Sequence, residues 1–253
     1  MRAIVRPHLG MLGMEPIRAM LEYARMRLMN DDDGVASGDG HPVVFFPGLG
    51  TDFRFTTPLI QHCKRVGYVC HDWGRGINTG PAGNPLEWLR DLALETAHRV
   101  RDHQETVSLV GWSLGGLYAR EVAKIIPHRV RQVITIGSPI ARVAHSTNVG
   151  WLYQWLHGGP ATMDRRLAKN LRTPPPVPTT SIYSRSDGVV AWKACLEAEG
   201  PMTENVEVDS SHLGLVWHPD VLAIVAERLS QTAGTWAPRR SSSSSATQQA
   251  KAA

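Results

Sequence analysis

The stretch GWSLGG, from Gly111 to Gly116, decides how this sequence folds. It lies between TVSLV, a short apolar run, and LYAREVAKII, whose apolar residues recur at helical spacing. We therefore predict a tight turn that carries the chain directly from a strand into a helix, with Ser113 at its apex. Glycines two residues before and two residues after the serine let the two backbones approach closely. The Ser113 hydroxyl is then expected to project beyond the carboxyl end of the strand.

The chain on either side of this stretch alternates between strand-like and helix-like segments. The strand-like runs are short, apolar or β-branched and bounded by turn residues: HPVVFFPG, YVCHDW, VRQVITIG, TTSIYS and NVEVD. The helix-like segments open with an N-cap and a proline at Thr57-Pro58 and Asn84-Pro85, or show helical spacing, as in DVLAIVAERL. This alternation predicts a doubly wound α/β fold with a mostly parallel sheet covered by helices on both faces.

Two loops after strands supply partners for the serine. A serine nucleophile needs a base, and the base needs an acid that orients it. Asp187 lies just past the run TTSIYS, and His212 lies just past NVEVD. Asp209 is nearer to His212 in the sequence, but Asp187 ends a neighbouring strand and is therefore the predicted orienting acid. The sequence predicts a catalytic triad of Ser113, His212 and Asp187.

Acyl transfer also needs donors for the oxygen that gains negative charge. Leu114 begins the helix after the serine, so its backbone N–H lacks an intrahelical partner. The second donor is expected from the loop after the first core strand, where Gly48 and Gly50 flank Leu49. We predict an oxyanion hole formed by the N–H groups of Leu49 and Leu114.

From about His41 to Leu229 the chain resembles the α/β-hydrolase superfamily, most closely its small bacterial serine lipases and esterases. The matching pieces are HPVVFFPGLG, GWSLGG, SIYSRSDGVV and SSHLGL, with serine, aspartate and histidine in the order typical of the family. The resemblance implies hydrolysis of a small or lipid-like carboxylic ester through an acyl-enzyme on Ser113, without a cofactor. Pro47 departs from the pattern, because many relatives have a histidine before the glycine.

Two other functions stay open. The same triad could transfer the acyl group to an acceptor other than water. The chain could also be an inactive hydrolase-like scaffold that binds a partner, although the complete set of triad residues weighs against this reading. A metal enzyme has no support, because the sequence contains no HExxH or CxxC spacing.

The organisation of the chain follows from these segments. Residues 1–40 are predicted to form a helical extension and linker, residues 41–231 the hydrolase domain, and residues 232–253 a disordered tail. An irregular block at about 139–176 occupies the position where α/β-hydrolases insert a small cap. Its run GWLYQWLHGG places Trp151 and Trp155 four residues apart, so both are candidate substrate-binding residues. Arg75 and Asn78, in the loop WGRGINTGP, are candidate substrate contacts. Alternatively, this glycine-rich loop only turns the chain.

The N-terminal extension contains an apolar helical stripe of Ile17, Met20, Leu21, Ala24 and Leu28. We expect this stripe to pack on the main domain, with peripheral contact with a membrane surface as the alternative.

The composition bears on three other classes of protein: membrane-spanning, nucleic-acid-binding and secreted proteins. No apolar run approaches the ~20 residues of a membrane span. The net charge of +4 comes from scattered basic residues, so we expect a solvated surface and no nucleic-acid partner. The three cysteines lie far apart and the N-terminus lacks the apolar core of a secretory signal, which together predict reduced thiols in a cytoplasmic protein.

Overall fold

The computed structural model describes residues 5–28, 37–140 and 170–239. Its centre is a six-stranded sheet in the order β2-β1-β3-β4-β5-β6, and every neighbouring pair is parallel. The strands occupy the runs that the sequence predicted: β1 (Pro42–Phe46), β2 (Val69–Asp72), β3 (Val107–Trp112), β4 (Val130–Ile136), β5 (Thr179–Ser184) and β6 (Thr203–Val208). The predicted doubly wound α/β fold is confirmed.

The strand order determines where a site can form. β1 pairs with β2 on one side and with β3 on the other, so the chain winds first in one direction and then in the opposite one. At such a reversal the loops after the two strands diverge, which opens a crevice at the carboxyl edge of the sheet. The loop after β1 contains Leu49 and the turn after β3 contains Ser113.

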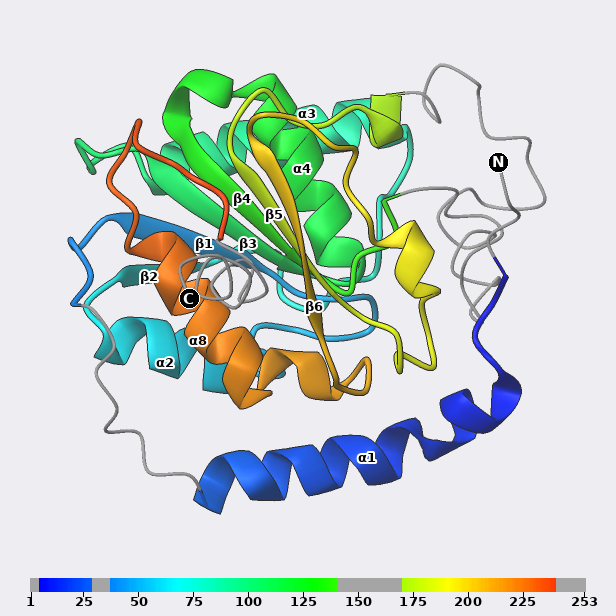
Figure 1. The fold of residues 1–253 in the computed structure, drawn as a ribbon. Helices are drawn as coiled ribbons and strands as arrows, with labels where there is room; N and C mark the ends of the chain where they lie inside the picture. Colours follow the sequence, from blue (N-terminus) through cyan, green and yellow to red (C-terminus); the bar gives the residue numbers. More distant parts are fainter. Residues whose placement is uncertain (1–4, 29–36, 141–169, 240–253) are drawn as a thin grey trace, which may run out of the picture.

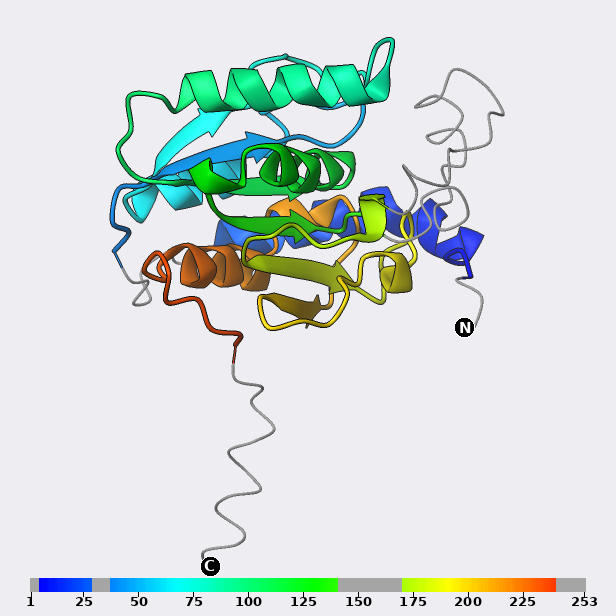
Figure 2. The same ribbon diagram turned by 90° about the horizontal axis from the view of Figure 1, so that it is seen from above.

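Helices cover both faces of the sheet (Figures 1 and 2). α3 (Pro85–Arg99) and α4 (Leu114–Ile125) pack on one face, and α2 (Thr57–Arg65) and α8 (Pro219–Leu229) on the other. Since both faces are covered, β1 and β3 are buried at every position.

Of the two N-cap residues predicted from the sequence, one is observed and the other is displaced by one residue. The predicted N-cap Asn84 accepts hydrogen bonds from the N–H groups of Leu86 (2.9 Å) and Glu87 (3.4 Å). The predicted N-cap Thr57 is instead the first residue of α2, and the cap is Thr56. Thr56 turns its hydroxyl back to the Phe53 carbonyl, so it makes no side-chain bond to the helix.

α1 (Leu9–Leu28) lies along the α8 side of the molecule, next to the 3-10 turn η3 (Gly214–Val216) (Figure 1). The helix packs on the domain as expected, but its apolar stripe does not make the contact. Ile17, Met20 and Leu21 are 49%, 64% and 62% exposed, whereas Glu15 is 2% exposed. The helix turns its polar face inward because the surface that receives it presents backbone N–H groups of two loops.

Two further predictions concern the candidate substrate-binding residues and the C-terminal tail. Trp151 and Trp155 lie outside the described residues. The first part of the predicted tail contacts the domain, since the Arg239 N–H donates to Glu204 at 2.8 Å and its guanidinium lies 2.9 Å from Glu227. Within the described ranges, no helix combines the length and apolarity needed to cross a membrane.

Candidate active site

Ser113 occupies a strained turn between β3 and α4. Its φ of 53° and ψ of −121° make it the only non-glycine residue with positive φ in the described part of the chain. A Cβ added to Gly115 would lie 2.1 Å from the Phe46 carbonyl oxygen, and one added to Gly111 would lie 2.4 Å from the Gly115 oxygen. Strand, loop and helix backbones therefore meet at distances that only glycine permits.

The three predicted triad residues lie together at the carboxyl edge of the sheet. The His212 Nε2 atom is 3.1 Å from the Ser113 Oγ atom, and the His212 Nδ1 atom is 2.7 Å from the Asp187 Oδ2 atom. Ser113, Asp187 and His212 are 8%, 2% and 3% exposed. The arrangement can take a proton from the serine hydroxyl and stabilise the imidazolium that results.

The second oxygen of Asp187 is held by its own turn. Oδ1 accepts hydrogen bonds from the N–H groups of Val189 (2.8 Å) and Val190 (2.7 Å), which leaves Oδ2 directed at His212. Asp209, the alternative acid, has a side chain that is 93% exposed and meets Ser186 and Arg18 instead. Its position next to the solvent does not fit an orienting role.

Opposing influences act on the pKa of His212. Burial alone lowers it, but the charge of Asp187, the hydrogen bond to Asp187 and the charge of Glu15 raise it, and the net result is a raised pKa. The backbone of this residue is held on both sides, because its N–H donates to Glu15 (3.0 Å) and its carbonyl accepts from the Trp112 indole (3.2 Å). The imidazole is therefore fixed in both position and charge environment.

The predicted oxyanion donors lie next to Ser113. Leu114 is the first residue of α4, so its N–H belongs to the helix turn that lacks intrahelical acceptors. A Cβ added to Gly48 would come within 3.3 Å of the Ser113 Cβ atom, which brings the peptide between Gly48 and Leu49 beside the serine.

The loop that contains Leu49 is braced by Asn78, which the sequence offered as a substrate contact. Asn78 is completely buried. Its side-chain amide donates to the Pro47 carbonyl at 2.7 Å, and its backbone bonds to Thr51 (2.7 Å) and Gly50 (2.8 Å). Arg75, the other residue considered in that loop, pairs with Glu95 at 2.7 Å. Asn78 therefore stabilises the conformation of the Leu49 loop through buried hydrogen bonds.

The inner face of α1 adds three charged residues that the sequence reasoning missed. Glu15 accepts from the backbone beside Asp187 and at His212, Glu22 accepts from the Ser211 N–H at 2.8 Å, and Arg18 donates to Ser186. Their spacing of three and four residues, which places them on one helix face, was a signal that could have been found.

A second serine, histidine and aspartate set lies at the opposite end of the sheet. His41 is 2.5 Å from Asp39 through Nδ1 and 2.8 Å from the Ser108 hydroxyl through Nε2. Both His41 and Ser108 are 0% exposed, and burial lowers the pKa of His41. These hydrogen bonds link the start of β1 to β3. Because His41 and Ser108 are completely buried, a substrate cannot reach them.

The fold and this site define a class of protein: an open parallel α/β sheet with a serine, a histidine and an aspartate in line at its switch point. Residues 43–243 match the model of the alpha/beta hydrolase family, and the chain belongs to that family.

Comparison with solved structures supports the fold. Lipase B of Aspergillus fumigatus superimposes with a TM-score of 0.57 at 18% identity, over 80% of this chain and 56% of that one. An aryl esterase from Burkholderia cenocepacia, described as putative, gives 0.55 at 15% identity, over 76% and 91% of the two chains. The lipase BlEst2 of Bacillus licheniformis gives 0.55 at 17% identity, over 79% and 96%.

Curated relatives match a smaller part of the chain. The pimeloyl-[acyl-carrier protein] methyl ester esterase of Legionella pneumophila (strain Corby) is 31% identical over 101 residues, which are 40% of this chain and 39% of that protein. The esterase of the same name from Shewanella oneidensis is 32% identical over 103 residues, 40% and 36% of the two chains. The alignments thus span well under half of these relatives.

Proposed function

We propose that this protein hydrolyses carboxylic esters through an acyl-enzyme on Ser113. The observation that carries the proposal is the continuous chain of contacts from Ser113 Oγ to His212 (3.1 Å) and from His212 to Asp187 (2.7 Å). Ser113 has a strained backbone and makes no side-chain hydrogen bond to the helix that follows, so its hydroxyl is available to His212.

The mechanism follows from the positions of the atoms. His212 Nε2 takes the proton of Ser113 as the hydroxyl oxygen bonds to the acyl carbon, and the N–H groups of Leu49 and Leu114 bind the resulting oxyanion. The C–O bond to the leaving alcohol breaks as His212 returns the proton to that oxygen. Water, activated by the same imidazole, then releases the acid and restores Ser113.

The substrate class rests on the relatives. The curated relatives are named as methyl ester esterases, and several solved structures of this fold are named as lipases or esterases. We therefore propose a small or lipid-like ester as the substrate and no metal or cofactor in the reaction. A chelator is accordingly expected to leave activity unchanged.

The test is hydrolysis of a graded acyl-ester series by the wild type and by Ser113→Ala. Loss of a triad nucleophile lowers turnover by about 10⁴-fold or more, whereas loss of one hydroxyl leaves folding nearly unaffected. A fluorophosphonate probe should label the wild type at Ser113 and leave the alanine variant unlabelled. Labelling of another serine, or equal activity of the two proteins, would refute the assignment.

The same experiment separates the alternatives. An acyltransferase would form an ester or amide when an alcohol or amine acceptor competes with water, which product analysis detects. An inactive binding scaffold would give a flat response across the ester series in both proteins.

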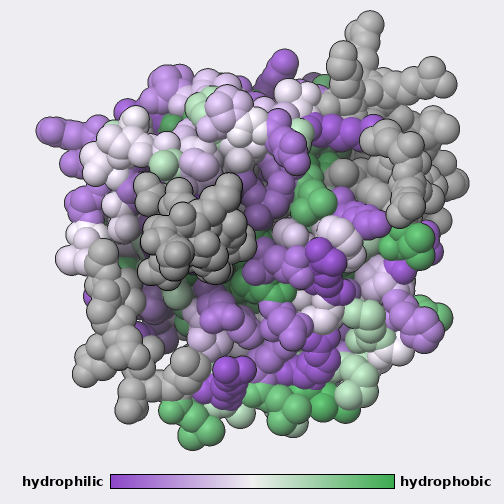
Figure 3. Space-filling view, viewed as in Figure 1, coloured by the Kyte–Doolittle hydropathy of each residue, from purple (hydrophilic) through white to green (hydrophobic). Residues whose placement is uncertain are grey.

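We also propose that α1 contacts an anionic lipid surface through its outer face. That face exposes apolar side chains over the length of the helix (Figure 3): Leu9, Met14, Ile17, Met20, Leu21 and Leu28. Both carboxylates of the helix, Glu15 and Glu22, face inward, whereas Arg25 and Arg27 are exposed. An apolar face flanked by arginines is typical of helices that lie in a membrane interface.

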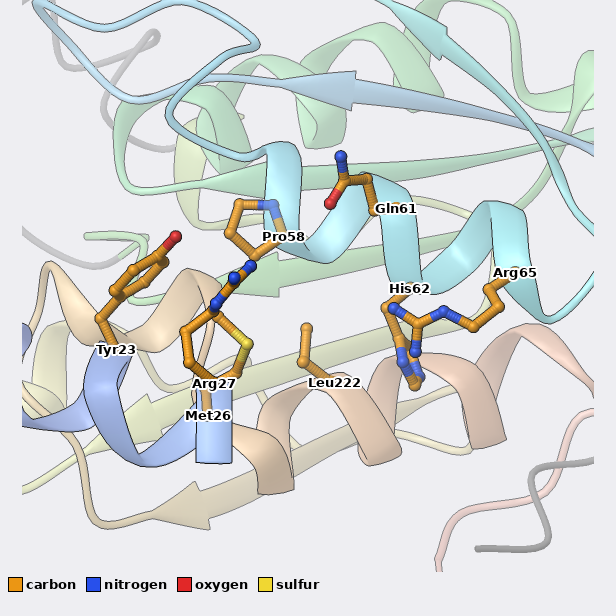
Figure 4. Close-up of a pocket in the computed structure, with 8 residues that line it drawn as sticks. All are labelled: Tyr23, Met26, Arg27, Pro58, Gln61, His62, Arg65 and Leu222. Carbon is orange, nitrogen blue, oxygen red and sulfur yellow. The ribbon is translucent and has the colours of Figure 1, made fainter. Parts of the chain in front are cut away.

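A groove beside the end of α1 strengthens the choice of an anionic surface. It has a volume of about 280 Å³, lies between α1, α2 and α8, and is lined by Tyr23, Met26, Arg27, Pro58, Gln61, His62, Arg65 and Leu222 (Figure 4). Arg27 and Arg65 give this lining a positive charge, and no carboxylate belongs to it. A lipid phosphate would complement these two arginines.

Sedimentation with vesicles tests this contact. Wild type should pellet with vesicles that contain phosphatidylglycerol, and a double change of Ile17 and Leu21 to Gln should abolish pelleting. Leu94→Gln, which alters a 65% exposed leucine on α3, is the matched control and should pellet normally. Concentration-dependent dimerisation that the same double change abolishes would instead assign the face to a second copy of the chain.

A further inference from the structure

A single buried carboxylate contacts both loops that carry the proposed catalytic acid and base. Glu15 Oε1 accepts hydrogen bonds from the N–H groups of Gly188 (2.7 Å) and His212 (3.0 Å), and Oε2 accepts from Leu213 (3.2 Å). Gly188 follows Asp187 directly in the sequence. Glu15 is 2% exposed, so these bonds are shielded from water.

Both loops have a glycine where α1 approaches most closely. A Cβ added to Gly188 would lie 2.6 Å from the Met11 carbonyl group, and one added to Gly214 would lie 1.5 Å from a Glu22 carboxylate oxygen. Side chains at these two positions would force the helix away. The absence of a Cβ therefore lets the helix backbone and the Glu22 carboxylate approach within van der Waals distance.

Two neighbours of Glu15 on the same helix face extend the contact. Arg18 donates to the Ser186 hydroxyl at 3.0 Å and to its carbonyl, one residue before Asp187. Glu22 accepts from the N–H of Ser211 at 2.8 Å, one residue before His212. Arg18, Glu15 and Glu22 thus bond to residues on both sides of Asp187 and of His212.

We propose that Glu15 is a positioning residue for the reaction, which holds the Asp187 and His212 loops at their mutual distance and places a negative charge next to His212. This inference rests on the proposed ester hydrolysis. The charged groups that face His212 are Asp187, from the loop after β5, and Glu15, from α1. Burial lowers the pKa of His212, and the charges of Asp187 and Glu15 both raise it.

The experiment compares Glu15→Gln, Glu15→Asp and Glu15→Ala by kcat, KM and the pH profile of kcat/KM. Glu15→Gln removes the charge, so the acid limb of the profile should move to lower pH. Glu15→Asp keeps the charge on a shorter side chain, so the limb should stay while kcat falls. Glu15→Ala removes all three acceptor contacts and should lower kcat by about 10–100-fold with little change in KM, since misplacement by about 1 Å has that cost.

Glu197→Gln is the matched control for a general loss of stability. Glu197 is 3% exposed and pairs with Arg120 at 2.8 Å, away from His212. Its replacement should lower the melting temperature without moving the acid limb. If a Glu15 variant folds only in part, the titration of the His212 Nδ1–H proton resonance in the folded fraction replaces the kinetic profile.

Failure of the Glu15 proposal can be distinguished from failure of the proposed ester hydrolysis. If wild type hydrolyses esters through Ser113 while Glu15→Gln and Glu15→Ala retain the wild-type kcat and acid limb, the positioning role of Glu15 is refuted. If Ser113→Ala is as active as wild type, the proposed function itself fails, irrespective of Glu15.

Discussion

The backbone strain at Ser113 leads to a prediction about two variants that both lack the nucleophile. With φ of 53° and ψ of −121°, this residue lies outside even the left-handed helical region. A non-glycine residue in such a region costs about 1–3 kcal/mol, and glycine adopts it without that cost. We expect Ser113→Gly to be more stable than Ser113→Ala, although both should be inactive.

The magnitude follows from two opposing effects. Since ψ is far from its left-handed value, we take the strain of alanine as about 2 kcal/mol. Glycine loses more backbone entropy on folding, which costs about 0.5–1 kcal/mol relative to alanine. The difference favours Ser113→Gly by about 1 kcal/mol. In a domain of this size that corresponds to a rise in melting temperature of about 2–4 °C.

Differential scanning calorimetry of the two variants measures this difference. Thr56 supplies the control, because it also precedes a helix but has an ordinary φ of −91° and ψ of 7°. There the change from Ala to Gly should lower the melting temperature. A Ser113→Gly protein that melts below Ser113→Ala would show that the turn is not strained and would refute the reasoning.

Three further outcomes test the site. Asp187→Asn should lower turnover by about 10³–10⁴-fold and Asp209→Asn by tenfold or less; the reverse order would reassign the orienting acid. Because the pKa of His212 is raised and the base must be neutral, kcat/KM should reach half its maximum above pH 6.5, and a midpoint below 6.5 would contradict this. Changing Trp151 and Trp155 to Ala should weaken long-chain esters more than short ones, whereas an equal loss would make them core residues.

The parts of the site that the sequence predicted are those fixed by strand ends. Ser113 directly follows β3, and Asp187 and His212 lie in the loops that follow β5 and β6. Parallel strands place their carboxyl ends along one edge of the sheet. Gly111 was equally informative, because a Cβ there would meet Gly115 and Gly116 of the same turn, whereas a Cβ on Gly115 would meet the Phe46 carbonyl of β1. Local patterns therefore located these residues without knowledge of the sheet order.

The orientation of α1 could not be predicted in this way. The rule that an amphipathic helix packs by its apolar face assumes an apolar partner surface. Here the partner surface includes N–H groups of Gly188, Ser211, His212 and Leu213, for which carboxylates are the better match. These loops lie side by side because β5 and β6 are paired neighbours in the sheet. The N–H groups are therefore a tertiary feature that no window of the sequence contains.

The three proposed catalytic residues differ in how their positions are secured. The backbone of Ser113 is fixed by its turn, and Asp187 by two N–H groups of its own loop. The parallel sheet fixes the ends of β5 and β6, but not the loops beyond them, and Asp187 and His212 are 25 positions apart in the sequence. The carboxylate of Glu15 is a shared acceptor for both loops, so a displacement of either loop weakens its bond to the other. On this argument α1 belongs to the site as much as the strands do, although it precedes the domain in the sequence.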